Sequence, residues 1–110
     1  MKKHISEMLA QVLDDYGFNV EEMEDSCEIS IYTPAGEDWC FYMLSDGDFE
    51  NYVEDFDPDE EFDVLYRSGV RGLPKPSELI EDQLWKQKTL NNVLDDYYER
   101  KRENETAHNN

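Results

Sequence analysis

Residues 27–43 read CEISIYTPAGEDWCFYM, and this stretch decides the fold because two alternating segments flank a turn. In CEISIY and in DWCFYM every second residue is apolar, which is the period of a β-strand with one buried face. The TPAGE between them has the composition of a turn. Pairing Ile31 with Trp39 also pairs Cys27 with Met43, so one register collects the apolar residues on one side. The stretch therefore predicts an antiparallel hairpin with a buried face.

The same register separates the two cysteines. Cys27 falls on the buried face and Cys40 on the opposite face, and a disulfide cannot join two faces of a pleated sheet. We therefore expect two free thiols, as is usual in a reducing cytoplasm. The exposed face is expected to be polar, aromatic and acidic together, and to carry Glu28, Ser30, Tyr32, Asp38, Cys40 and Tyr42.

One helix and one strand are predicted before the hairpin. Apolar residues at spacings of three and four predict a helix over residues 5–16. Residues 18–23 then form a candidate third strand, with Phe18, Val20 and Glu22 on one face.

Three helices are predicted after the hairpin. Ser45 and Asp57 are candidate N-caps of two short helices. Ser77 is the candidate N-cap of a long helix that continues to about Arg100. Residues 70–76, with two prolines, are expected to form the loop before it. The predicted buried stripe of the long helix consists of Leu79, Ile80, Gln83, Leu84, Gln87, Leu90, Val93, Leu94 and Tyr97.

These elements predict the α+β fold class, with a three-stranded antiparallel meander and helices on one face. The order is α-β-β-β-α-α-α, and the last helix is long. A length of 110 residues is that of a single small domain. We expect this domain to span residues 1–100 and a disordered polar tail to follow over residues 101–110.

The acidic residues are concentrated in one part of the chain. Residues 21–66 contain 17 of the 28 acidic residues and no Lys or Arg, in a chain of formal net charge −18. The same stretch is rich in aromatic and aliphatic residues, which are sparse in disordered acidic tails. We therefore expect a folded acidic face. Such a face is repelled by nucleic acid and by anionic lipid, and its expected partner is a basic protein surface, such as that of a DNA-binding protein or nuclease.

Catalytic and metal-binding motifs are missing from the sequence. The only histidines are His4 and His108, each near a terminus, so a Cys-His or Ser-His-Asp arrangement is not expected. A calcium loop counted from Asp55 fails, because Glu60 occupies the glycine position and Tyr66 the position of the bidentate glutamate. We expect no enzymatic activity, no cofactor and no dedicated metal site. No apolar run of signal or membrane length occurs, so a cytoplasmic location is expected.

The leading functional hypothesis is a DNA mimic, an inhibitor of the anti-restriction or anti-CRISPR type in which carboxylates take the places of phosphates. Two alternatives stay open. The acids serve only solubility, or the long helix docks a partner or a second copy through Trp85 and Tyr98. The residues predicted to contact the partner of a DNA mimic are Glu21, Glu22, Glu24, Asp25, Glu28, Asp48, Glu50, Glu54, Asp55, Asp59, Glu60, Asp63, Tyr32, Tyr42 and Tyr52.

The second half of the chain contains the runs FDPDEEF at residues 56–62, SGVRGLP at 68–74 and SELIED at 77–82. These three runs resemble a family of small acidic proteins of gut Firmicutes and their mobile elements. This resemblance implies no particular activity. In order of elements and in charge the chain is also similar to acidic phage-encoded inhibitors of Cas9, which by analogy implies occupation of a DNA-binding cleft. No functional residue is carried over from either resemblance.

Overall fold

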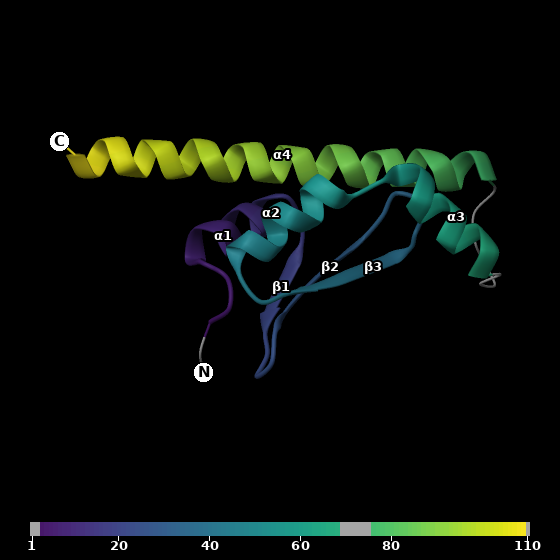
Figure 1. Cartoon of the computed structure of the whole chain (residues 1–110), viewed down its shortest axis with the longest axis horizontal. Helices are drawn as coiled ribbons and strands as arrows, with labels where there is room; N and C mark the ends of the chain where they lie inside the picture. Colours follow the sequence, from purple (N-terminus) through teal and green to yellow (C-terminus); the bar gives the residue numbers. More distant parts are fainter. Residues whose placement is uncertain (1–2, 69–75, 110) are drawn as a thin grey trace.

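A computed structural model describes residues 3–68 and 76–109, and within them it contains a three-stranded sheet and four helices (Figure 1). The α+β class, the order of elements and the long last helix are as the sequence predicts. The elements are α1 (Glu7–Asp15), β1 (Asn19–Glu22), β2 (Cys27–Tyr32), β3 (Asp38–Met43), α2 (Asp46–Asp55), α3 (Pro58–Ser68) and α4 (Pro76–Asn109).

The sheet is an antiparallel meander in the order β1-β2-β3. Its hairpin has the predicted register, with Ile31 opposite Trp39 and Cys27 opposite Met43. Strand β1 pairs with β2 so that Glu22 also lies opposite Cys27, on the core side. Both cysteines are free, Cys27 buried and Cys40 exposed, which confirms the prediction from the register.

The core lies between one face of the sheet and the helices α1, α2 and α4 (Figure 1). Trp39 occupies its centre, with ring centroids 5.8 Å from Phe18, 5.2 Å from Phe41 and 6.3 Å from Trp85. Aromatic pairs at these separations favour a single packing arrangement. The cluster therefore ties α4 to the strands.

Short polar side chains begin the first three helices. Ser6 Oγ accepts a hydrogen bond from the backbone N–H of Leu9, and Ser45 Oγ accepts one from that of Asp48, each at 3.1 Å. Asp57 Oδ1 accepts a bond from the backbone N–H of Asp59 at 3.0 Å ahead of α3. These contacts satisfy N–H groups that the first turn of a helix leaves unpaired.

The long helix α4 begins and ends one or more residues from the predicted positions. It starts at Pro76, a residue suited to a first helical position, rather than after a cap at Ser77. It continues past Arg100 to Asn109, so residues 101–109, expected to be disordered, are helical. Helix-favouring Glu, Arg and Lys residues explain the extension. The C-terminal end of α4 reaches beyond the other elements (Figure 1).

Two further observations concern the rest of the chain. The predicted loop at residues 70–76 lies almost entirely outside the described residues. Within residues 3–68 and 76–109, none of the helices is both long and apolar enough to cross a membrane.

Candidate functional site

The outer face of the sheet is polar and aromatic, as the alternation predicts. Tyr32 and Tyr42 are 71% and 59% exposed, and the thiol of Cys40 lies between them on β3 and is exposed as well. These tyrosines are therefore free to contact a partner.

The acidic residues predicted to act together fall into two separate groups. Successive turns of a meander lie at opposite ends of the shared strand, here β2 (Figure 1). The first group surrounds the β1–β2 turn and consists of Glu21, Glu22, Glu24, Asp25 and Glu28. The second belongs to α2 and α3 and consists of Asp48, Glu50, Glu54, Asp55, Asp59, Glu60 and Asp63. Helix α2 begins after Met43, which lies opposite Cys27, so Asp48 and Glu50 are on the half of α2 nearer the β1–β2 turn. The end of α2 and the start of α3 lie nearer the β2–β3 turn, where Phe56 contacts Trp39.

In the first group, the fold itself uses Glu22. Its carboxylate accepts hydrogen bonds from the backbone N–H groups of His4 at 2.9 Å and Ile5 at 3.2 Å, and His4 Nδ1 lies 2.9 Å away. Burial raises the pKa of Glu22, but these hydrogen bonds outweigh it and hold the pKa below its ordinary value. Glu22 therefore anchors the N-terminal segment, while Glu21, Glu24 and Asp25 are exposed.

On α2, two of the predicted contact residues, Asp48 and Tyr52, also serve the fold. Asp48 accepts a hydrogen bond from the backbone N–H of Leu44 at 2.8 Å. Tyr52 is stacked on Phe41 with ring centroids 4.5 Å apart, and its hydroxyl accepts a bond from Trp39 Nε1 at 3.1 Å. Burial raises the pKa of Tyr52 to about 12. Tyr52 is thus part of the core rather than a surface anchor.

The remaining acids form a dense cluster where α2 meets α3. We name as the acidic corner the exposed side chains of Glu54, Asp55, Asp57, Asp59 and Glu60. Three of them, at 57, 59 and 60, lie at the start of α3, where the helix dipole favours negative charge. The other two end α2, where the dipole opposes negative charge, and α2 has no basic residue in its last turn. Helix stability therefore accounts for only part of the acidic corner.

A small groove runs along the acidic corner. Its volume is about 230 Å³, and Phe56 and Val64 supply its apolar walls. Val64 is 58% exposed. The other lining residues are Tyr52, Asp55, Asp57, Glu60 and Glu61. An apolar strip edged by carboxylates is suited to the methylene stem and charged end of a lysine or arginine.

A buried cation lies beneath this end of the molecule. Lys86 of α4 is fully buried, and its Nζ lies 2.7 Å from Glu37 Oε2, 4.0 Å from Glu61 Oε1 and 5.3 Å from the centre of the Trp39 ring. This pairing joins the β2–β3 turn, α3 and α4. It also pairs Glu37 and Glu61 internally, whereas the side chains of the acidic corner are exposed to solvent.

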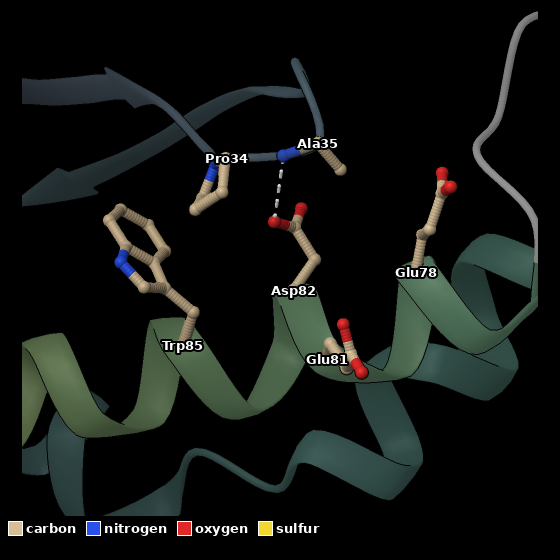
Figure 2. A pocket seen from close by; sticks show the side chains of 6 residues that line it. All are labelled: Pro34, Ala35, Glu78, Glu81, Asp82 and Trp85. Carbon is tan, nitrogen blue, oxygen red and sulfur yellow. Dashed lines mark hydrogen bonds between the residues drawn. The ribbon is translucent and has the colours of Figure 1, made fainter.

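A second hollow, of about 550 Å³, lies between the β2–β3 turn and the first turns of α4 (Figure 2). Asp82 lies within it, 3% exposed, and accepts a hydrogen bond from the backbone N–H of Ala35 at 3.2 Å. Sequence periodicity gave no signal for Asp82 or Lys86, because both fall outside the apolar stripe. Conversely, Leu84 was predicted on that stripe and is 52% exposed.

Trp85 and Tyr98, the residues predicted to dock a partner through the long helix, differ in how far they are exposed. Trp85 is half-buried against Trp39, whereas Tyr98 is 39% exposed and its ring centroid lies 5.6 Å from that of Tyr97.

Among the described residues no group of three His, Cys, Asp or Glu side chains is arranged to hold a metal ion. Comparison of the chain with family models, curated proteins and solved structures found no match.

Proposed function

We propose that this chain is a non-enzymatic binding protein whose acidic corner occupies the nucleic-acid-binding surface of a basic protein, in the manner of duplex DNA. Arginine and lysine on such a surface bind carboxylates as well as phosphates, because they donate charge-assisted hydrogen bonds to the oxygens of either group. An inhibitor of a nuclease or of another DNA-binding protein works in this way, and the anti-restriction and anti-CRISPR types fall within this class.

The placement of Glu54 and Asp55 carries the proposal. Both carboxylates are exposed at the C-terminal end of α2, against the helix dipole and beside three further acids. Solubility alone is served equally well by acids spread over the surface, without this repulsion. Acids clustered against the dipole are instead explained by a cationic partner that relieves the repulsion on binding.

The groove beside the acidic corner adds an apolar component. Binding energy comes chiefly from desolvated apolar and aromatic contacts, whereas exposed charges set the approach and the choice of partner. Phe56 and the exposed Val64 supply such contacts within the ring of acids. The proposed complex therefore places basic side chains of the partner along this groove.

Docking through α4 is the second candidate function. It is favoured by the exposed Leu84 and Tyr98 and by the reach of the helix beyond the body of the molecule (Figure 1). In that case the acids serve solubility.

The two candidates are separated by capture of host proteins on the immobilised chain, with duplex DNA added or withheld. The test variant is Glu54→Gln/Asp55→Asn at the acidic corner. Its matched control is Glu24→Gln/Asp25→Asn at the β1–β2 turn, which makes the same two chemical changes at the other end of the sheet. A third variant, Tyr98→Ala, tests docking through α4.

The proposal predicts a captured nucleic-acid-binding protein that duplex DNA displaces. Exposed ion pairs contribute roughly 0.2–1 kcal/mol each, so the corner variant should bind about 2- to 30-fold more weakly than the control variant. Equal weakening by both double variants would attribute binding to overall charge and contradict the role of the corner. Loss on Tyr98→Ala, with no effect of DNA, would establish the α4 alternative instead.

A further inference from the structure

The hollow between the β2–β3 turn and α4 contains a carboxylate with an unused acceptor. Asp82 is 3% exposed, and one of its oxygens accepts the bond from Ala35 N–H, while Oδ2 has no hydrogen-bond partner within residues 3–68 and 76–109. None of the ion pairs among the described side chains involves Asp82. A buried polar atom without a partner costs free energy, and more so when the group is charged.

The walls of the hollow add negative charge and an aromatic ring. Glu78, Asp82 and Trp85 project from one side of α4, with the Trp85 ring beside Pro34, and Glu81 lies next to them on the helix (Figure 2). Among the residues that the structure describes, none of those that line the hollow is basic. Three carboxylates and an indole face are the groups that recognise an organic cation, through charge-assisted hydrogen bonds and a cation–π contact.

The size and chemistry of the hollow favour such a cation over a metal ion. A volume of about 550 Å³ accommodates a whole arginine or lysine side chain. As noted above, the described His, Cys, Asp and Glu side chains form no group of three suited to a metal.

We propose that this hollow is a receptor for one guanidinium or ammonium group, inserted by a side chain of the same basic partner that contacts the acidic corner. This inference rests on the proposed function for the identity of the partner, but the cation site can be tested without any partner. The site lies at the end of the sheet where Lys86 joins the β2–β3 turn to α3 through Glu37 and Glu61. A partner that covers the acidic corner is therefore within reach of the hollow.

The test is an NMR titration of the full chain, labelled with nitrogen-15, with N-acetyl-arginine N-methylamide at low ionic strength. The control ligand is the citrulline analogue, which has nearly the same shape and no charge. Saturable shifts are expected at the amide of Ala35, the amide of Asp82 and the indole N–H of Trp85. The citrulline analogue should leave these signals in place.

Two variants locate the binding. Asp82→Asn retains an oxygen for the Ala35 N–H and removes the charge, and should weaken arginine binding roughly 10-fold or more, as expected for a lost hydrogen bond to a charged group. Glu24→Gln, at the opposite end of the sheet, should change nothing. Trp85→Leu provides a second test should Asp82→Asn fail to fold, with weakening again expected.

Equal binding of citrulline, or unchanged binding to a folded Asp82→Asn protein, would overturn the proposal. Arginine shifts confined to the acidic corner would also overturn it, although they would agree with the proposed function. If arginine enters the hollow but no captured protein is displaced by DNA, then the proposed function fails and the cation site stands.

Discussion

Replacing Lys86 with methionine tests the buried ion pair that joins three elements of the fold. Lys86 is fully buried, its Nζ lies 2.7 Å from Glu37 Oε2, and the side chain of Glu37 is 21% exposed. Methionine retains the unbranched stem that packs under Trp39 and removes only the charged end. Lys86→Met therefore leaves the Glu37 carboxylate without its cation.

The expected loss of stability follows from that burial. Removing one partner of a buried ion pair typically costs about 3–5 kcal/mol, because the other charge stays desolvated and unpaired. Glu37 Oε1 has no hydrogen-bond partner in the part of the chain that the structure describes, so no second contact there compensates. Its partial exposure allows some rehydration, which places the loss near the lower limit, at about 3 kcal/mol. For a domain of this size such a loss lowers Tm by roughly 12–24 °C.

Urea denaturation followed by circular dichroism gives this free energy directly. The double variant Lys86→Met/Glu37→Gln removes both charges and should regain most of the lost stability, because apolar or neutral replacements of a buried pair are often nearly neutral. A matched surface control is Lys3→Met, which removes a lysine paired with Glu7 at 2.9 Å on an exposed helix start. It should change stability by less than about 1 kcal/mol.

A loss of stability below about 1 kcal/mol for Lys86→Met would show that the pair contributes no more than an exposed ion pair, and would contradict the role of its burial. Failure of the double variant to recover would refute it in a different way. The lysine would then be needed for packing rather than for its charge.

Three further predictions concern the thiols, alkaline pH and salt. Cys27 is buried, which raises its pKa to about 11, whereas Cys40 is exposed. Iodoacetamide should therefore modify only Cys40 in the native chain and both cysteines in denaturant, as counted by mass spectrometry. Modification of both cysteines in the native chain would contradict the register. In the folded chain the pKa of Tyr52 is raised from 10.0 to about 12, so its neutral hydroxyl contributes its full share of folding stability below pH 10 and loses it as the pH rises to 12. Tm should therefore fall between pH 10 and pH 12, and it should fall less steeply in the Tyr52→Phe variant. Sodium chloride should raise Tm by screening the acidic corner, and less so in Glu54→Gln/Asp55→Asn; an equal rise in both would place the repulsion elsewhere.

The hairpin was predictable because its evidence is local. Alternation in residues 27–43 permits one register with a buried face, and that register fixes the partners of Trp39 and the opposite placement of the two cysteines. Helix starts at Ser45 and Asp57 were predictable for the same reason, since capping depends on a few consecutive residues.

The burial of polar residues on α4 was not predictable from periodicity. This helix packs against α1, α2 and α3, and it contacts β3 through Trp85 and Trp39, so a sector wider than one apolar stripe is covered. Asp82, Gln83 and Lys86 are buried in that sector, whereas Leu84 is left exposed. Such burial depends on where distant segments cross the helix, which spacing within the helix does not contain.

The candidate site was predictable in its charge and not in its shape. The sequence gives the number of acids between Glu21 and Tyr66 but not the end of the sheet at which each lies, because that depends on the meander. Tyr52 illustrates the same limit. It was predicted to anchor a partner because it neighbours the acids, while the fold stacks it on Phe41.

Competition between the chain and duplex DNA for the captured partner shows whether the acidic corner occupies a nucleic-acid-binding surface. The measurement is the affinity of the chain for its captured partner by fluorescence anisotropy, repeated at increasing concentrations of a short duplex. We expect mutually exclusive binding, with an apparent Kd that rises linearly with duplex concentration and a complex that contains either the chain or the duplex. A ternary complex of partner, duplex and chain, with an unchanged Kd, would contradict it.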